Sequence, residues 1–312
     1  MKALVTGGAG FIGSNLVDAL LERGAEVVVV DNLSTGRREN LDGALAGDAK
    51  LVELDITDGE ALAALVTSES PDTVFHFAAQ IDVRKSLADP AFDASINVGG
   101  TANLLEAARA AGVRRFVFAS TGGAIYGEGV DKQLPLKEDA PIEPFSAYGQ
   151  SKYAGEGYLA LYERLYGLST VSMRFGNVYG PRQDPHGEAG VIAIFSGKLR
   201  AGEQPTVYGT GRQTRDYIYV GDVVSGLIAA GDSDVAGSIN LGTEEETTVL
   251  QIVEKLGALS EGSGFEAQMA EARLGEIDRS CLAVGKAREL LGWQAQVGID
   301  EGLRLTYEAS AP

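Results

Sequence analysis

Short runs of β-branched residues alternate with longer helical patterns through the first half of the chain. The run Glu26–Asp31 (EVVVVD) is apolar between its ends, as expected for a strand buried on both faces of a sheet. Similar strands are predicted at Lys2–Thr6, Leu51–Leu54, Thr73–Phe77 and Arg115–Ser120. Helices are predicted between them at Phe11–Arg23, Asp58–Thr67 and Phe92–Ala111. This alternation predicts an α/β fold, a doubly wound parallel sheet with helices on both faces.

The pattern changes after about residue 170, where loops lengthen and glycines cluster. Further helices are predicted at Gly190–Ala201, Asp222–Gly231, Val249–Leu259, Lys286–Leu291 and Asp300–Glu308. We therefore expect two domains, residues 1–170 and a smaller α/β domain of residues 171–312. Thr170–Arg174 and Ser238–Leu241 also look like strands of the first sheet, so we expect the two domains to be partly interleaved.

A glycine-rich turn joins the first predicted strand to the first predicted helix. Gly7, Gly10 and Gly13 form a GxxGxxG pattern, and Phe11 and Ile12 open the helix. Glycines at such a turn let the backbone approach a pyrophosphate, and the helix N-terminus offers N–H donors and a positive dipole. The same pattern also suits a plain tight turn in a chain with 41 glycines. Its place between a strand and a helix favours dinucleotide binding.

Asp31 strengthens this interpretation because it ends the second predicted strand, 18 residues after Gly13. A carboxylate at this place accepts hydrogen bonds from the two ribose hydroxyls of a dinucleotide. It also repels a 2′-phosphate, which favours NAD over NADP. Arg37 and Arg38 follow in the next loop, so some use of NADP stays open. The alternative role of Asp31 is to cap a turn.

Tyr148 and Lys152 lie four residues apart in the segment YGQSK, which places both side chains on one face of a helix. A lysine ammonium beside a phenol stabilises the phenolate, so we expect a lowered pKa for Tyr148. Such a phenol is a general base for an alcohol whose carbon loses a hydride. Composition alone often produces such a pair, so its weight depends on its place after the fifth strand of a glycine-loop fold.

The charge and the rare residues exclude several classes of function. The 312 residues carry 26 Lys and Arg against 44 Asp and Glu, a net charge of −18 that repels nucleic acid. Cys281 is the single cysteine, so an intrachain disulfide is excluded and a reducing cytoplasm is expected. Because His76 and His186 are the only histidines, we expect neither a His/Cys metal site nor a Ser-His-Asp triad. We expect no membrane span and no signal peptide.

Six segments spread over the chain occur in the order of a known family: TGGAGFIG (Thr6–Gly13), HFAAQ (His76–Gln80), STGGAIYG (Ser120–Gly127), YGQSK (Tyr148–Lys152), RFGNVYGPRQ (Arg174–Gln183) and GRQTRDYIYVGDV (Gly211–Val223). The chain resembles the extended short-chain dehydrogenase/reductase family, and within it the nucleotide-sugar enzymes similar to UDP-glucose 4-epimerase. No segment is specific alone, but together they cover almost the whole length. The resemblance implies a Rossmann-like NAD-binding domain at 1–170 and a nucleotide-sugar-binding domain at 171–312.

The resemblance implies which residues contact NAD. They are Gly7, Gly10, Phe11, Ile12 and Gly13 of the glycine loop, Asp31 and Asn32 after the second strand, Asp55 and Ile56 after the third, Ala78, Ala79 and Gln80 after the fourth, and Asn97, Tyr148 and Lys152. Within this set, Asp55 and Ile56 are expected on the adenine side, and Asn97 is expected to support the nicotinamide side.

The resemblance also implies a hydroxyl at the end of the fifth strand that hydrogen-bonds the reacting oxygen of the sugar. We expect Thr121 in this catalytic role, with Ser120 as the second candidate, although either hydroxyl also suits the backbone at a strand end. Related 4,6-dehydratases carry an acid directly after this threonine, where the present chain has Gly122 and Gly123. This difference favours epimerisation over dehydration.

For the nucleotide end of the substrate, the resemblance implies two arginines and an acid in the second domain. Arg215 matches a diphosphate-binding arginine, and guanidinium groups suit bidentate contacts with oxygen. Arg273 and Glu276 match a motif whose arginine contacts phosphate and whose acid contacts the uridine ribose. Leu274 replaces the proline of that motif. Each arginine would otherwise form a surface salt bridge.

Further positions bear on the choice of substrate. Asn177 is expected at the sugar diphosphate, and Tyr208 is expected to stack on uracil. Ser280 takes the place of a bulky tyrosine found in some epimerases, so an N-acetyl group on carbon 2 is expected to fit. Asp184 follows the PRQ triplet where uronate-specific relatives carry an arginine, which disfavours UDP-glucuronate, whereas the nearby Arg182 keeps that substrate open.

Together these residues predict an NAD-dependent epimerase that acts at carbon 4 of a UDP-hexose through a transient 4-keto intermediate. The alternatives are a UDP-glucuronate 4-epimerase, a nucleotide-sugar 4,6-dehydratase and, from a different class, a catalytically idle NAD-binding module. The sequence does not decide between UDP and dTDP. We also expect a homodimer through helices at Phe92–Ala111 and Ser146–Tyr166, with Leu104, Leu105 and Ala108 on an apolar face.

Overall fold

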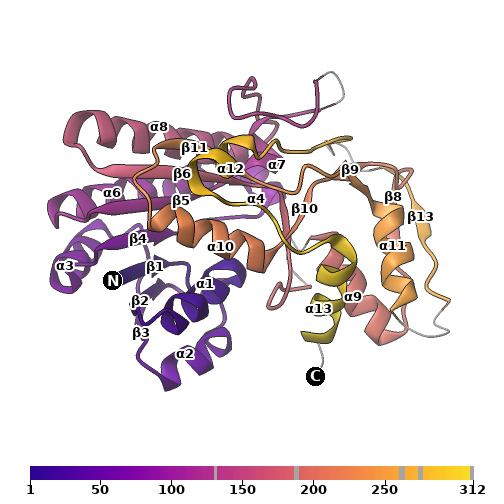
Figure 1. The fold of residues 1–312 in the computed structure, drawn as a ribbon, viewed down its shortest axis with the longest axis horizontal. Coiled ribbons are helices and arrows are strands. Elements are labelled where there is room, and N and C mark those ends of the chain that lie inside the picture. Colours follow the sequence, from indigo (N-terminus) through magenta and orange to yellow (C-terminus); the bar gives the residue numbers. More distant parts are fainter. Residues whose placement is uncertain (130–131, 186–189, 260–263, 273–276, 310–312) are drawn as a thin grey trace.

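The centre of the molecule is a seven-stranded parallel sheet with the strand order β11-β6-β5-β4-β1-β2-β3. The computed structural model describes residues 1–129, 132–185, 190–259, 264–272 and 277–309 (Figure 1). The strands of the sheet are β1 (Lys2–Thr6), β2 (Glu26–Asp31), β3 (Lys50–Glu53), β4 (Thr73–His76), β5 (Arg115–Thr121), β6 (Ser169–Phe175) and β11 (Gly237–Leu241). The predicted doubly wound sheet is confirmed, and it includes the two strand-like segments from the second half of the chain.

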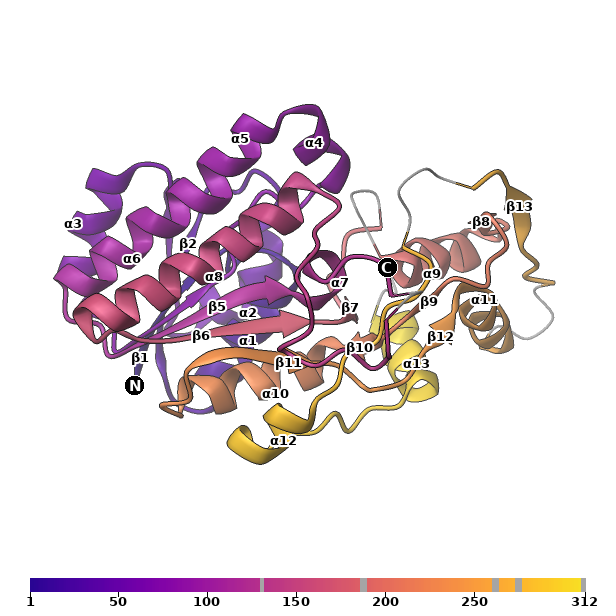
Figure 2. The same ribbon diagram turned by 90° about the horizontal axis from the view of Figure 1, so that it is seen from above.

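Helices cover both faces of this sheet, as Figures 1 and 2 show. One face carries α1 (Phe11–Glu22), α2 (Asp42–Ala46), α10 (Val220–Gly231) and α12 (Gly285–Leu291), and the other carries α3 (Gly59–Glu69), α6 (Thr101–Ala110) and α8 (Ala147–Tyr166). Side chains alternate between the faces of a strand. Accordingly, Val27 and Val29 of β2 belong to the core under α1, and Val30 belongs to the core under α3. The unbroken valine run therefore reflects burial on both sides.

The strand order reverses beside β1, because the chain passes from β1 outward to β2 and β3 and then returns to β4 on the other side. The loops after β1 and β4 consequently lie next to each other. Phe77 N donates to Thr6 O (2.9 Å), and Ala78 N donates to Thr6 Oγ1 (3.3 Å). In open α/β sheets, ligands bind in the crevice outside the carboxyl ends of the strands at such a reversal.

The helix predicted at Phe92–Ala111 is confirmed as a continuous helical run, which contains a π-helical turn that the sequence pattern did not predict. The structure has α4 (Val83–Ala88), α5 (Pro90–Ala94), a π-helical turn at Ser95–Gly100 and then α6. The widened turn lies where Gly100 packs on the third strand's loop: a Cβ on Gly100 would lie 2.5 Å from Ile56 Cδ1. π-helical turns are frequent at functional sites.

A smaller group of elements follows at the end of the sheet. It contains α9 (Val191–Ala201), α11 (Val249–Ala258) and α13 (Ile299–Ala309), with the strand pairs β7 (Asn177–Tyr179) and β10 (Tyr217–Tyr219), β9 (Thr214–Arg215) and β12 (Thr247–Thr248), and β8 (Thr206–Tyr208) and β13 (Gln268–Ala270). The expected domain boundary at residue 170 falls within β6. The division of the chain into two domains stays a prediction. Within the described part of the chain, no helix combines the length and the apolar character of a membrane span.

Candidate active site

The glycine turn between β1 and α1 has no room for a side chain at Gly7 or Gly13. Gly7 has a φ of +68°, which favours glycine. A Cβ on Gly7 would lie 2.6 Å from Ala78 N, and one on Gly13 would lie 2.3 Å from Gly7 O. Gly10 N donates to Gly7 O (3.1 Å) and caps α1, whose first residues are Phe11 and Ile12. The bare backbone therefore brings the α1 N-terminus to the edge of the crevice, which suits a pyrophosphate.

Asp31 is locked at the end of β2 beside this turn. Its Oδ2 accepts from Ala9 N (2.9 Å) and its Oδ1 accepts from Leu33 N (2.9 Å). Burial raises the pKa of Asp31, and these two backbone donors oppose the rise. Each carboxylate oxygen accepts more than one hydrogen bond. Asp31 thus caps a turn, as its alternative role required, and still has acceptor capacity for ribose hydroxyls.

A hydrogen bond joins the loop after β2 to the loop after β3, which carries the predicted adenine-side residues Asp55 and Ile56. Asn32 Nδ2 donates to Asp55 Oδ2 (2.7 Å). Asp55 Oδ1 accepts from the Thr57 backbone N (2.8 Å) and from Thr57 Oγ1 (2.7 Å), and these hydrogen bonds lower the pKa of Asp55. Ile56 is buried against Gly100. The structure therefore brings Asn32, Asp55 and Ile56 together at one corner of the crevice.

The segment after β4, which includes Ala78 and Ala79, is held by a buried amide. Asn97 Oδ1 accepts from Gln80 N, and Asn97 Nδ2 donates to Gln80 O, both at 2.9 Å. Asp93 Oδ1 accepts from Asn97 Nδ2 (3.0 Å) and from Gln80 Nε2 (2.9 Å). The Asn97 side chain thus bonds the backbone of the segment that follows β4, which suits a supporting role. Asp93 is a component that the sequence patterns did not reveal.

Tyr148 and Lys152 lie near the start of α8, with Lys152 directed at the end of β5. Tyr148 N donates to Ser86 Oγ (3.1 Å), which ties this turn of α8 to α4. Lys152 is buried, its Nζ donates to Ala119 O (2.8 Å), and the ammonium lies 6.0 Å from the Tyr148 ring centroid. The predicted shared face of the helix is therefore present.

The expected lowering of the Tyr148 pKa is wrong for the protein by itself. Burial raises the pKa of Tyr148, and the negative charge of Asp93 raises it further. Burial also lowers the pKa of Lys152 to about 8, against the opposing charges of Asp93 and Glu156. Loss of hydration is therefore the largest cause of both shifts, and it acts in opposite directions on an acid and on a base.

The two candidate hydroxyls at the end of β5 have different surroundings. Ser120 is 3% exposed, and its Oγ donates to the carboxylate of Glu156 (2.6 Å). Thr121 is partly exposed, and it caps α7 (Gly122–Ile125) without using its side chain. The hydroxyl of Ser120 is therefore engaged by a buried carboxylate. Thr121 remains the candidate to contact the substrate.

The glycines after Thr121 differ in the space around them. A Cβ on Gly122 would lie 2.5 Å from Leu282 Cδ1, so this position has no room for a side chain. A Cβ on Gly123 would lie 3.5 Å from Asn177 Oδ1 and 3.9 Å from Thr121 Oγ1. The missing side chain at Gly123 therefore leaves open space between two polar groups of the predicted substrate site.

Predicted substrate residues from β7, β9 and the segment before α12 are neighbours. Asn177 N donates to the backbone O of Asp216 (2.7 Å), next to Arg215, and Ser280 N donates to Thr214 O (3.3 Å). Asn177 Oδ1 is buried and has no hydrogen-bond partner within the described residues. Arg215 Nη1 donates to Thr214 O (2.8 Å). The amide oxygen of Asn177 can accept a hydrogen bond from a ligand hydroxyl, whereas a guanidinium group such as that of Arg215 suits an anionic ligand.

Of the three other residues predicted to contact the nucleotide, the structure describes only Tyr208. Tyr208 lies in β8, and Gln213 Nε2 donates to its backbone O (3.1 Å), which ties β8 to the segment just before Arg215. Arg273 and Glu276 lie outside the described residues. Their predicted contacts with phosphate and ribose stay predictions.

Comparison with known proteins agrees with this arrangement. A sequence model described as the NAD dependent epimerase/dehydratase family matches residues 3–242. The chain belongs to this family. The UDP-glucose 4-epimerase of Mycolicibacterium smegmatis is 48% identical over 99% of this chain and 98% of its own length. Two solved structures are similar over 99% of this chain and 98% of theirs. They are UDP-glucose 4-epimerase of Thermotoga maritima with UDP-glucose (TM-score 0.94, 45% identity) and that of Thermus thermophilus with NAD (TM-score 0.92, 44% identity).

NAD is the cofactor of this family, and the residues present fit it. The glycine turn provides a backbone cradle that a Cβ would fill, and Asp31 keeps acceptor capacity beside it. Arg37 pairs with Asp184 at the surface (2.9 Å). The predicted preference for NAD over NADP rests on Asp31 and stays a prediction.

Asp184 and Arg182 both form ion pairs with elements that flank the glycine turn. Asp184 Oδ2 accepts from Arg37 after β2, and Arg182 Nη2 donates to Asp18 of α1 (2.6 Å). The expectation that Asp184 disfavours UDP-glucuronate, with Arg182 keeping that substrate open, stays a prediction.

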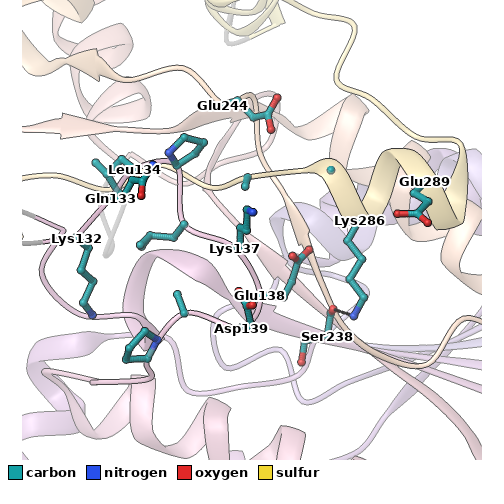
Figure 3. A pocket seen from close by; sticks show the side chains of 16 residues that line it. Lys132, Gln133, Leu134, Lys137, Glu138, Asp139, Ser238, Glu244, Lys286 and Glu289 are labelled. Carbon is teal, nitrogen blue, oxygen red and sulfur yellow. Dashed lines mark hydrogen bonds between the residues drawn. The ribbon is translucent and has the colours of Figure 1, made fainter.

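A second hollow lies at the free edge of the sheet and is separate from the residues above. Figure 3 shows this cavity of about 1170 Å³ between the loop 132–141, β11 and α12. Lys286 Nζ donates to Ser238 O (2.7 Å), and Glu138 Oε1 accepts from Asn240 N (2.9 Å). These side chains cap the exposed backbone of β11, as edge strands require. None of the predicted site residues lines this cavity in the described part of the chain.

Proposed function

We propose that this chain is a UDP-glucose 4-epimerase that interconverts UDP-glucose and UDP-galactose with NAD as a catalytic cofactor. The observation that carries the proposal is the convergence of the glycine turn, Thr121 and the Tyr148–Lys152 helix at the carboxyl ends of the strands. Gly122 and Gly123 supply no acid for elimination. The similarity to UDP-glucose 4-epimerases at 44–48% identity supports the same activity.

The protein's own residues divide the work at carbon 4. Thr121 donates a hydrogen bond to the 4-oxygen and orients it, the ionised phenolate form of Tyr148 takes the hydroxyl proton, and the positive charge of Lys152 favours that phenolate. Bound, oxidised NAD would supply a positively charged nicotinamide ring, and it would accept the hydride from carbon 4 of the sugar and later return it. The resulting 4-keto sugar turns over in the pocket and is reduced on its opposite face, while Tyr148 returns the proton. Substrate and product are therefore isomers, with no net redox change.

The sugar must rotate while its nucleotide stays bound. The backbone N of Asn177 is bonded to Asp216, the residue after Arg215, so both residues are suited to hold the nucleotide end of the substrate while carbon 4 changes face, with Arg215 on the diphosphate. Arg273 and Glu276 complete this anchor in the proposal, on phosphate and ribose respectively. A diphosphate held at one end leaves the hexose free to turn about its own linkage.

Product analysis tests the activity. Purified protein is incubated with UDP-glucose, and the configuration at carbon 4 is followed by NMR. UDP-galactose is the expected product. A 4-keto-6-deoxy sugar would identify a dehydratase, and turnover of UDP-glucuronate in place of UDP-glucose would identify a uronate epimerase. Absence of turnover on UDP- and dTDP-sugars with NAD still bound would leave a catalytically idle module.

We propose that UDP-N-acetylhexosamines are also substrates. Ser280 is a small buried residue whose backbone is bonded to the strand that carries Arg215. A serine leaves more room beside the sugar than a tyrosine would. Parallel assays with UDP-glucose and UDP-N-acetylglucosamine test this, and Ser280→Tyr should remove the second activity and keep the first. Turnover of UDP-glucose alone by the unaltered protein would contradict it.

We propose a cytoplasmic homodimer, but not through the face first expected. Leu104, Leu105 and Ala108 are 0% exposed and pack in the core under α3 and α8, so they are not available to a partner. Tyr166 and Leu165 of α8 are 54% and 62% exposed. Light scattering on the purified protein should give twice the chain mass, and Leu165→Glu should shift it toward the monomer. The single cysteine, which is buried, is in keeping with a reducing compartment.

A further inference from the structure

Glu156 extends the catalytic face of α8 by two turns beyond Tyr148. It lies eight residues after Tyr148 and four after Lys152, so the three side chains follow one stripe of the helix. The Glu156 side chain is 6% exposed. A carboxylate is rarely buried to this degree without specific partners.

Four hydrogen bonds satisfy this carboxylate, and they come from three adjacent strands. Oε1 accepts from Ser120 Oγ of β5 (2.6 Å) and from Arg174 Nε of β6 (2.9 Å). Oε2 accepts from Arg174 Nη2 (2.6 Å) and from Ser238 Oγ of β11 (3.2 Å). Hydrogen bonds to an ionised acceptor are shorter and stronger than neutral ones, and a bidentate arginine fixes their geometry.

Two successive residues of β5 are thereby held by two successive turns of α8. Lys152 Nζ donates to Ala119 O (2.8 Å), and Glu156 accepts from the hydroxyl of Ser120, the next residue. The residue after Ser120 is Thr121, the partly exposed candidate for the catalytic hydroxyl. Any slip between α8 and β5 would change the position of Thr121 relative to Tyr148.

We propose that Glu156 is a positioning residue that sets the Thr121 hydroxyl against the Tyr148 phenol, and that Ser120 transmits this effect. Ser120 itself does not contact the sugar in this account. The inference rests on the proposed function, since it assigns a consequence to the distance between two groups of that reaction. It differs from a purely stabilising role because it predicts a lower kcat in variants that remain folded.

Two matched substitutions test the proposal. Ser120→Ala and Ser238→Ala each remove one hydroxyl donor from the same carboxylate, and both leave its pairing with Arg174 intact. Ser120→Ala should lower kcat about tenfold, while the KM for UDP-glucose and the NAD content stay within twofold. Ser238→Ala should leave kcat within twofold, because Ser238 is on the edge strand away from Thr121. Equal kcat values in the two variants would overturn the proposal.

A double-mutant cycle separates positioning from direct contact with the sugar. Glu156→Gln should lower kcat by a factor similar to that of Ser120→Ala, and the double variant should lose little more. Ser120→Thr, which keeps the hydroxyl, should recover most of kcat. Losses that multiply in the double variant would mean that Ser120 acts on the sugar itself, which overturns the inference. Should Glu156→Gln fail to fold with Arg174 unpaired, the serine pair still decides.

A structural readout keeps this test distinct from that of the activity. Crystal structures of both serine variants give the distance from Thr121 Oγ1 to the Tyr148 phenol oxygen. This distance should differ from that of the unaltered protein in Ser120→Ala and not in Ser238→Ala. An unchanged distance in Ser120→Ala would refute the positioning role whatever the enzyme turns over, whereas an inactive unaltered protein would refute the proposed function.

Discussion

Gly13→Ala is expected to destroy the dinucleotide site while leaving the rest of the fold in place. A Cβ at this position would lie 2.3 Å from Gly7 O and 2.8 Å from Gly8 Cα. Both neighbours are backbone, so relief requires the whole turn to move by roughly 1 Å, and overpacking of this kind costs about 1–3 kcal/mol. The same movement displaces the N–H groups at the start of α1. Each hydrogen bond to a charged group contributes about 1.5–3 kcal/mol, so the affinity for NAD should fall at least tenfold.

Gly157→Ala is the matched control, because it is also a glycine within a helix but has no atom within 4 Å of its added Cβ. This substitution should stabilise the protein by about 0.5–1 kcal/mol, since alanine is the better helix former. Melting temperature and NAD content, measured by calorimetry and by extraction with chromatography, distinguish the two variants. A Gly13→Ala protein that keeps a full complement of NAD and the original melting temperature would refute the reasoning.

Further changes should separate the roles within the site. Thr121→Val, which keeps the shape and removes the hydroxyl, should lower kcat about 100-fold with little effect on UDP-sugar binding measured by calorimetry; an active variant would exclude Thr121 as the hydroxyl. Lys152 loses its charge above its pKa of about 8, while Tyr148, whose pKa is raised, gains basic form as the pH rises, so the two opposing titrations predict a kcat/KM that rises up to about pH 8 and then levels off; a continued rise above pH 8 would show that the charge of Lys152 is not needed. Asp31→Asn should weaken NAD binding about tenfold and improve NADP binding in titrations, because the carboxylate no longer repels a 2′-phosphate; unchanged selectivity would exclude the ribose contact.

Local pattern was sufficient for most of the sheet and its helices. β2 spans Glu26–Asp31 as predicted, because four consecutive valines suit only a strand that is buried on both sides. The π-helical turn between α5 and α6 was not predictable, because it coincides with contacts to distant segments. Asn97 bonds Gln80 across the crevice, and Gly100 packs on Ile56. Periodicity within one window contains no information about such partners.

The sequence was sufficient to predict which residues form the candidate site, but not the pKa shifts of those residues. Spacing placed Tyr148 and Lys152 on one helical face, but it said nothing of the burial that raises one pKa and lowers the other. The hydroxyl choice at Ser120 and Thr121 likewise depended on Glu156, which lies 36 residues away from Ser120 in the chain. The position of Glu156 four residues after Lys152, on the same face of the helix, was the available signal in the sequence. Only the strands packed against it show what it binds.

Deuterium at carbon 4 of the sugar reports on the redox step at the centre of this account. UDP-[4-²H]glucose is incubated with the protein in unlabelled water, and the product is characterised by NMR and mass spectrometry. We expect UDP-galactose that retains the deuterium at carbon 4, and no detectable turnover with Tyr148→Phe. Loss of the label to water, or inversion that persists in Tyr148→Phe, would contradict proton transfer by this phenol coupled to hydride exchange at carbon 4.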